Sequence, residues 1–358
     1  MQLGLQNKSK TPGGNVSATQ YKTAKAVFRK ERQKRESIVN TSFHSVPKYW
    51  LTVEGSPNLQ AELALIPNGS KILEIGPGPG RMTEALFQKQ CDVTVIELDR
   101  ELAKWCEPYS SRIILGDVET LDLDDALDET YDVVLFGDVI EHLRRPIDVI
   151  RKLRSRISET GFLLACIPNI SHGSVRLALL QGKFQYQEDG LLDHTHISFF
   201  TWSSIRELVN FSGYTIQAVQ PIRTGVLESE VVVDILDVPI SVLKLICKDP
   251  EATVYQYVIK AAPMRDDEPR VVEAWNLRDE NWNYKRVKAG AAKLYKEAGF
   301  RWFWNAPAKF RRYFFRAFLL NAQIKTLVYI VISFLPFRLI KPLHDRFGFA
   351  SARRIISD

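Results

Sequence analysis

The residues best suited to chemistry in this chain are three alternating glycines and an acid that follows them. Gly76, Gly78 and Gly80 come directly after a short apolar run. The next apolar run ends at Glu97, 17 residues beyond Gly80. Glycines at a strand-to-helix turn let the backbone approach a ligand closely, and an acid closing the next strand can accept hydrogen bonds from both hydroxyls of a ribose. The pattern predicts a nucleoside-binding site.

The loop sequence argues against a dinucleotide as the ligand. The pyrophosphate fingerprint requires glycine or alanine where Arg81 stands, and Pro77 and Pro79 remove two backbone N–H groups from the loop. A ligand without phosphates fits better, although a degenerate dinucleotide loop is the alternative. The stretch from Glu74 to Gly80 resembles motif I of the class I S-adenosylmethionine-dependent methyltransferases, E/D-x-G-x-G-x-G.

This resemblance implies roles for residues at the ends of four strands. The glycines would pack on the methionine part of S-adenosylmethionine, and Glu97 would hold the ribose, its alternative being a solvated acid at a strand end. Asp117 would accept from the adenine amino group beside the Val118 N–H, although Gly-Asp is also common in turns. The implied cofactor-binding residues are Glu74, Gly76, Gly78, Gly80, Glu97, Asp117, Val118, Gly137 and Asp138.

Acidic and imidazole side chains follow the fourth apolar run, where the methyl group would face its acceptor. Glu141 and His142 resemble a Glu-His pair common in small-molecule methyltransferases, and they could cap the next helix. Together with Asp138 they could instead begin a divalent-metal site, as in some 2'-O-methyltransferases of RNA ends. Because such clusters at helix starts are often structural, we assign no metal from the sequence.

A more specific resemblance covers residues 168–172, 182–186 and 190–201. These segments are similar to a subgroup of methyltransferases that accompany glycosyltransferases and modify bacterial surface glycans or their lipid-linked precursors. A hydroxyl acceptor needs a base, and histidine titrates in the useful range. The candidate catalytic residues are His172, His194 and His196. In the alternative, Asp193 and His196 only pin the loop; absence of the N-P-P-Y signature of amine and amide methylation favours oxygen as the acceptor.

Alternating strands and helices predict an α/β fold, the Rossmann-like seven-stranded sheet of the class I methyltransferases, with helices on both faces. The predicted strands are Ile72–Ile75, Val93–Ile96, Arg112–Leu115, Tyr131–Phe136, Phe162–Ile167 and the closing pair Tyr214–Val219 and Val254–Ala261. The predicted helices are Arg81–Lys89, Glu101–Cys106 and Pro146–Ser158.

Charge divides the 358 residues into three parts. Residues 1–45 form a basic segment that we expect to be disordered, residues 46–263 form the methyltransferase domain, and residues 264–358 form a basic, aromatic-rich helical extension. The net charge is +7 over residues 1–44, −11 over 45–263 and +10 over 264–358. An acidic centre disfavours nucleic acid as a partner. Four scattered cysteines without a paired motif indicate a reducing cytoplasm with neither a disulfide framework nor a zinc site.

The C-terminal extension allows two hypotheses. Aromatic residues interleaved with Lys and Arg over 302–318, followed by the apolar run 327–337, suit the headgroup boundary of an anionic membrane. The extension would then hold the protein at the inner face of the membrane, close to a lipid-linked acceptor. The alternative is a helical cap packed on the methyltransferase core.

The sequence therefore predicts an S-adenosylmethionine-dependent methyltransferase that O-methylates a sugar hydroxyl of a glycan or glycolipid intermediate. The alternatives are an aromatic or quinone O-methyltransferase, an RNA methyltransferase, and a cofactor-binding subunit without turnover.

Overall fold

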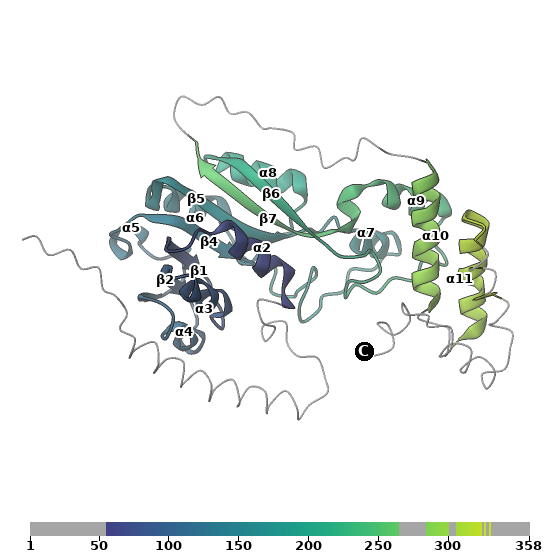
Figure 1. Ribbon diagram of the computed structural model, residues 1–358, viewed down its shortest axis with the longest axis horizontal. Helices are drawn as coiled ribbons and strands as arrows, with labels where there is room; N and C mark the ends of the chain where they lie inside the picture. Colours follow the sequence, from purple (N-terminus) through teal and green to yellow (C-terminus); the bar gives the residue numbers. More distant parts are fainter. Residues whose placement is uncertain (1–54, 265–283, 301–305, 324–325, 327–328, 331–358) are drawn as a thin grey trace, which may run out of the picture. The chain divides into compact units, whose positions relative to one another are not determined.

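The computed structural model describes residues 55–264, 284–300, 306–323, 326 and 329–330 (Figure 1). The predicted N-terminal segment, Trp302, Trp304 and most of the apolar run 327–337 lie outside the described residues.

The described chain contains a seven-stranded sheet with the order β3-β2-β1-β4-β5-β7-β6. The strands are β1 (Lys71–Ile75), β2 (Asp92–Glu97), β3 (Arg112–Leu115), β4 (Tyr131–Gly137), β5 (Ile157–Pro168), β6 (Tyr214–Arg223) and β7 (Val254–Pro263). The first five are parallel, and β7 runs antiparallel to both β5 and β6. The predicted fold is confirmed, including the closing antiparallel pair. Because the strand order reverses between β1 and β4, their carboxyl ends open the crevice in which such sheets bind ligands.

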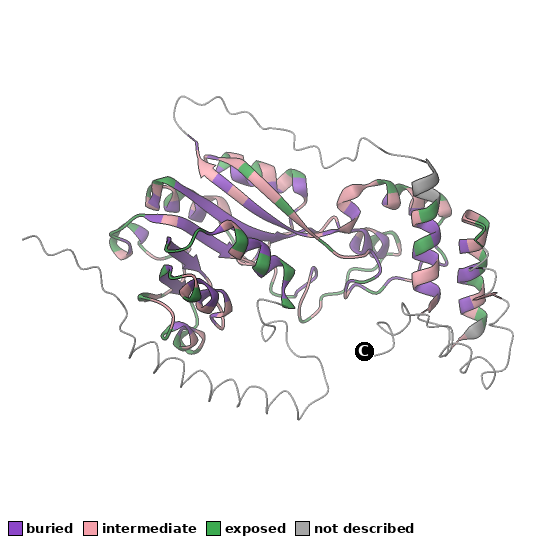
Figure 2. Ribbon diagram, in the orientation of Figure 1, coloured by how far each residue is buried: buried purple, intermediate pink, exposed green. Residues whose placement is uncertain are grey.

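Helices cover both faces of the sheet (Figure 1). They are α2 (Pro57–Leu65), α3 (Arg81–Gln88) and α4 (Arg100–Cys106) on one face, and α5 (Leu123–Ala126), α6 (Pro146–Leu153) and α8 (Trp202–Phe211) on the other. Alternate residues of β1 supply both cores, since Leu73 and Ile75 pack with α6 and α8 whereas Ile72 packs with α2 and α3. Burial on both faces explains why the central strands are apolar throughout, as the purple ribbons of Figure 2 show.

One predicted helix ends earlier than expected. The predicted range Pro146–Ser158 divides into α6, a 3-10 turn at Arg154–Arg156 and the first residues of β5. Ile157 pairs with Tyr131 of β4, so sheet pairing overrides the helical pattern there.

A second apolar core lies beyond the sheet. It joins α7 (Gly173–Leu180), α9 (Ile240–Lys248), α10 (Tyr284–Phe300) and α11 (Pro307–Leu320) with the segment 226–238. Polar contacts also hold α11, because Asp234 pairs with the Lys309 ammonium at 2.6 Å and accepts a hydrogen bond from the Tyr313 hydroxyl. The described part of the C-terminal extension therefore packs on the core as the cap hypothesis expects. No helix in the described ranges is both long and apolar enough to span a bilayer.

Candidate active site

The glycine loop leaves β1 in a conformation that requires glycine. Gly76, Gly78 and Gly80 have φ of +61°, +55° and +72°. A Cβ at Gly76 would lie 2.9 Å from Cγ2 of Val139, and one at Gly80 would lie 3.1 Å from Sγ of Cys106. At Gly78, by contrast, no described atom lies within 4 Å of the Cβ position. Gly76 and Gly80 therefore serve packing, whereas Gly78 faces open space at the end of the strand.

Glu97 closes β2 directly beside this loop. The residue is 6% exposed, and its carboxylate accepts hydrogen bonds from the Gly78 N–H at 3.1 Å and the Asp99 N–H at 2.9 Å. Asp99 in turn caps α4 by accepting from the N–H groups of Glu101 and Leu102. The structure thus brings the predicted glycine loop and the predicted ribose-binding acid together, and each carboxylate oxygen retains acceptor capacity for a ligand hydroxyl.

Asp117 and Val118 follow β3 as the sequence predicted. Asp117 Oδ1 accepts a hydrogen bond from the Glu119 N–H at 2.9 Å, which forms a tight turn, and the Val118 side chain is buried in the core. Both residues follow β3, which pairs with β2, the strand that Glu97 ends. Their adenine-binding role stays a prediction.

A buried acid that sequence analysis missed lies on α2. Glu62 is fully buried, and neither of its carboxylate oxygens has a hydrogen-bond partner among the described residues. A Cβ on Gly137 would lie 3.4 Å from its Oε1, which places Glu62 against the end of β4. Burial raises its pKa well above the ordinary value, and Asp138, Glu74 and Glu141 raise it further. The sequence pattern that could have revealed Glu62 is its position three residues after Leu59, which places both side chains on the same face of the helix.

Glu74 is a second buried acid near the loop. It accepts a hydrogen bond from the Thr83 hydroxyl at 2.8 Å and is 3% exposed. Burial raises its pKa to about 7, although the bond from Thr83 opposes this shift. Burial therefore favours the neutral form of both acids, and a cation close to them would favour the charged form.

Asp138 follows β4 with φ of +55°, which is unusual for a residue other than glycine. Its Oδ2 accepts from the Asn58 amide at 3.0 Å, and its Oδ1 accepts from the Gln256 amide at 2.6 Å. Both carboxylate oxygens are therefore held by side chains from α2 and β7. Strained backbone that the surrounding structure fixes in this way is common at functional sites.

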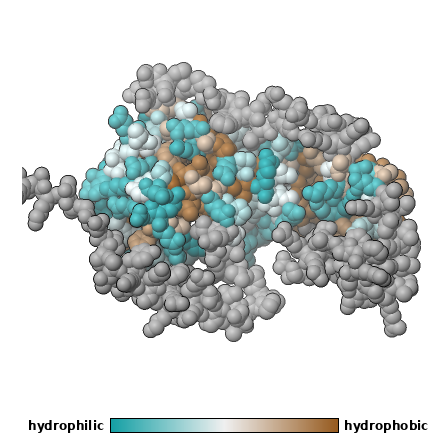
Figure 3. Space-filling model, viewed as in Figure 1, coloured by the Kyte–Doolittle hydropathy of each residue, from teal (hydrophilic) through white to brown (hydrophobic). Residues whose placement is uncertain are grey.

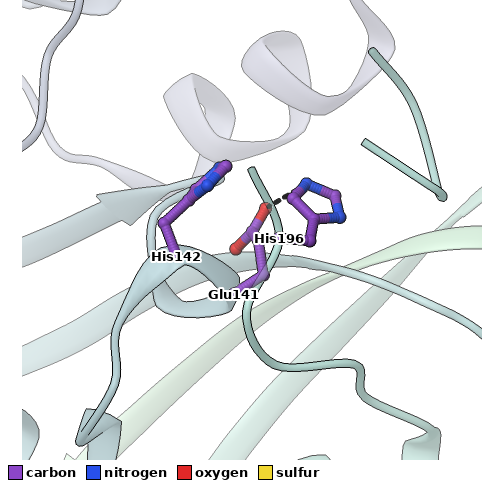
Figure 4. A group of neighbouring side chains, drawn as sticks. All are labelled: Glu141, His142 and His196. Carbon is purple, nitrogen blue, oxygen red and sulfur yellow. Dashed lines mark ion pairs between the residues drawn. The ribbon is translucent and has the colours of Figure 1, made fainter. Parts of the chain in front are cut away.

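Glu141, His142 and His196 form a cluster at the same end of the sheet (Figure 4). Glu141 and His142 lie in the 3-10 turn Ile140–His142, whereas α6 begins after Arg145. The hypothesis that they cap α6 is therefore wrong. Glu141 Oε1 lies 3.9 Å from Nε2 of His196, and the two imidazole rings meet edge to face at 4.9 Å between centroids. Burial lowers the pKa of His196, and His142 lowers it further, so its imidazole is neutral at pH 7.

Backbone hydrogen bonds bring this cluster together across 55 residues of sequence. The Glu141 carbonyl accepts from the N–H groups of Ile197 and Ser198, both at 2.9 Å. Asp193 stiffens the same loop by accepting from the Thr195 N–H and hydroxyl at 2.7 Å each. Burial would raise the pKa of Asp193, but the bonds from Thr195 hold it below its ordinary value.

Comparison with known proteins finds a family match that covers the glycine loop and the first five strands. Residues 49–219 match the family model described as a methyltransferase domain. The chain carries a class I S-adenosylmethionine-dependent methyltransferase domain. S-adenosylmethionine is the cofactor of this domain, and the open space at Gly78 beside the Glu97 carboxylate fits its ribose.

The curated relatives that match the chain have several kinds of acceptor in their names. Ribosomal RNA small subunit methyltransferase A of Erythrobacter litoralis is 41% identical over 81 residues, covering 20% of this chain and 29% of the relative. Ubiquinone biosynthesis O-methyltransferase of Xanthomonas campestris is 26% identical over 120 residues, covering 32% of this chain and 50% of the relative. The chain thus spans half or less of the length of these relatives. Among solved structures, the CcbJ methyltransferase of Streptomyces caelestis is 15% identical with a TM-score of 0.41, covering 60% of this chain and 94% of that one.

The three histidines proposed from sequence lie in different environments of the methyltransferase domain. His172 is fully buried and caps α7; its Nδ1 lies 2.8 Å from the Ser174 hydroxyl, and its Nε2 lies 3.1 Å from the Thr224 carbonyl. His194 is exposed, with Nδ1 3.1 Å from the Gln187 carbonyl. Only His196 joins an acid and a second imidazole. The position of His172 suits a structural cap, and a catalytic role for any of the three histidines stays a prediction.

Proposed function

We propose that this protein transfers a methyl group from S-adenosylmethionine to a hydroxyl of a sugar in a glycan or glycolipid intermediate. The observation that carries this proposal is the Glu141–His142–His196 cluster, which lies next to exposed aromatic rings. Phe199 packs edge to face on His196 at 6.1 Å and on Phe184 at 5.8 Å, and Phe184 packs on Tyr186 at 5.4 Å.

The exposure of these rings supports a flat, amphipathic acceptor. Phe184 and Tyr186 are 41% and 58% exposed, and Ile197, two residues before Phe199, is 56% exposed. Apolar (brown) surface is visible among hydrophilic (teal) surface over the strands in Figure 3. An aromatic face packs on the C–H face of a sugar ring, while the sugar hydroxyls remain available to polar groups. Large apolar side chains that a soluble domain leaves exposed near its site are candidates for ligand contact.

The reaction itself is a direct displacement. The acceptor oxygen attacks the methyl carbon, the C–O bond forms as the S–C bond breaks, and the electron pair passes to sulfur to give S-adenosylhomocysteine. The hydroxyl proton leaves to water. The chain's contribution is alignment of donor and acceptor, which can supply a large part of the rate enhancement.

A small aromatic or quinone O-methyltransferase is the second candidate. The same exposed rings would stack on an aromatic acceptor, and one matching relative is named for ubiquinone biosynthesis. The acidic centre of the chain continues to disfavour RNA, although another relative is named for ribosomal RNA.

The test uses S-adenosylmethionine labelled in its methyl group, incubated with the full-length protein and separate lipid, glycan, quinone and RNA fractions of its host. We expect label in glycan or glycolipid, recovered after acid hydrolysis as a methylated sugar. Label confined to quinones or RNA would overturn the sugar assignment, and absence of label from every fraction would favour a subunit that binds the cofactor without turnover. Full-length protein that sediments with anionic vesicles would support membrane contact through the C-terminal extension, which we retain as a proposal beside its packing on the core.

A further inference from the structure

We propose that Glu141, His142 and His196 bind one divalent transition-metal ion, which holds the acceptor hydroxyl. The metal site stands on the geometry of these residues; its use in catalysis rests on the proposed function.

The three side chains offer ligand atoms at nearly the right separation. One carboxylate oxygen and two ring nitrogens lie within 4.8 Å of one another (Figure 4). The 3.9 Å between Glu141 Oε1 and His196 Nε2 is too long for a hydrogen bond. Ligand atoms about 2.1 Å from a metal lie about 3.0–3.4 Å apart in octahedral or tetrahedral geometry. An ion would therefore require a contraction of about 0.5 Å between these two atoms and of up to about 1.4 Å between the most widely spaced ligand atoms of the cluster.

Hydrogen bonding presents His142 as a ligand. Its Nδ1 lies 3.2 Å from the Thr195 carbonyl, which can only accept, so Nδ1 carries the proton. The Thr195 hydroxyl lies equally close but donates its own proton to the Asp193 carboxylate. Nε2 of His142 is therefore left with its lone pair, the state that a metal ligand requires. An Asp–Thr–His arrangement of this kind fixes both the tautomer and the orientation of a ligating imidazole.

The cluster is also rigidly supported. The two backbone bonds from Ile197 and Ser198 to the Glu141 carbonyl fix His196 relative to Glu141, and the Glu141 side chain is 1% exposed. Asp138 is not among the residues whose ligand atoms lie together; its two oxygens accept hydrogen bonds from the Asn58 and Gln256 amides.

The donor set selects the class of ion. Two imidazoles and one carboxylate favour zinc, manganese, iron(II) or cobalt(II) over magnesium and calcium, which prefer oxygen ligands. Three protein ligands leave coordination positions open for a hydroxyl and water. A hydroxyl bound to the ion loses its proton to water more readily, and the resulting alkoxide attacks the methyl carbon as the S–C bond breaks. The direct alternative, a proton relay from His196 to Glu141, is disfavoured by their 3.9 Å separation.

The test begins with binding and needs no acceptor. Full-length protein is treated with a chelator, desalted and titrated with cobalt(II), and binding is read from visible absorption and calorimetry. We expect one ion per chain with a spectrum typical of nitrogen and oxygen ligands. His142→Ala, His196→Ala and Glu141→Gln should each weaken binding at least tenfold, whereas His194→Ala, a histidine of the same loop outside the cluster, should leave it unchanged. Thermal shifts with S-adenosylhomocysteine show that each variant is folded.

Stoichiometric binding with this pattern of variants would establish the site. Wild-type protein that binds no cobalt would overturn the site, even if every cluster variant failed to fold. A loss of cobalt affinity in His194→Ala as large as that in His196→Ala would also overturn it. The catalytic half is tested separately by methyl transfer before and after chelation. Methyl transfer to the glycan at full rate after chelation would show that the reaction does not need the ion, and the proposed function would stand. Metal binding without glycan methylation would support the metal site and reject the glycan as the acceptor.

Discussion

Gly78 and Gly76 form a matched pair that tests whether the open space at the loop is the cofactor site. Both have positive φ, so an alanine at either position costs about 1–2 kcal/mol of backbone strain. For a domain of this size that strain lowers Tm by about 2–8 °C. The two sites differ in what the new methyl group meets. At Gly76 it meets Val139 Cγ2 at 2.9 Å, which adds overpacking of about 1–3 kcal/mol, whereas at Gly78 it meets nothing described.

The assay is thermal denaturation with and without S-adenosylhomocysteine. At a ligand concentration of about 100 times the wild-type Kd, binding stabilises the folded protein by about 2.7 kcal/mol. We expect Gly78→Ala to fold with a modestly lower Tm but to bind at least tenfold more weakly, which reduces the stabilisation to about 1.4 kcal/mol or less. Gly76→Ala should show the lower Tm of the two without ligand.

The outcome that refutes this reasoning is a full ligand-induced shift in Gly78→Ala. Such a shift would mean that the cofactor does not occupy the space over Gly78. Calorimetric titration of both variants gives their affinities directly and checks the result.

Three further predictions follow from buried groups. Glu97→Ala should remove two charge-assisted bonds to the ribose, each worth about 1.5–3 kcal/mol, and weaken cofactor binding at least tenfold by calorimetry; unchanged affinity would exclude Glu97 from the site. His172→Ala should lower Tm while retaining turnover per folded molecule, whereas His196→Ala should lower turnover and retain Tm. An equal loss of turnover in both variants would contradict the assignment of His172 as a cap. The pKa of Glu74 is raised to about 7 by burial, so its contribution to stability is full below its unfolded value of 4.5 and is lost as pH rises through 7. The free energy of unfolding of Glu74→Gln, measured by urea denaturation relative to wild type, should therefore rise by roughly 2–3 kcal/mol from about pH 5 to pH 8. If the unfolding free energies of the two proteins change in parallel with pH, the pKa of Glu74 is not raised.

The sequence predicted those parts of the molecule whose signals are local. Each strand appeared as a short apolar run bounded by loop residues, and the glycine loop and Glu97 were found because neighbouring parallel strands place their carboxyl ends together. The end of α6 was missed because pairing of Ile157 with β4 is a long-range contact.

The acceptor side depended on contacts that no local pattern reveals. Prediction of Glu62 as a site residue would have required knowing that α2 places its side chain against Gly137. His196 lies close to Glu141 because the loop after Asp193 folds back onto the turn after β4. His172 shared the residue type and the neighbourhood expected of a base. Its burial, together with the neighbouring Ser174 hydroxyl and Thr224 carbonyl, distinguishes it from His196 in the structure.

Charge connects the buried acids with the ligands inferred for this site. Glu62, Glu74 and Glu97 are almost inaccessible to water, and burial of ionised carboxylates is costly unless they are paired or protonated. The folded chain limits this cost without ligand by raising the pKa of Glu62 and Glu74. A sulfonium or an ammonium close to these acids would favour their charged state and be attracted to it. We therefore expect the site to favour cations and to fit the phosphate-rich backbone of a nucleic acid poorly.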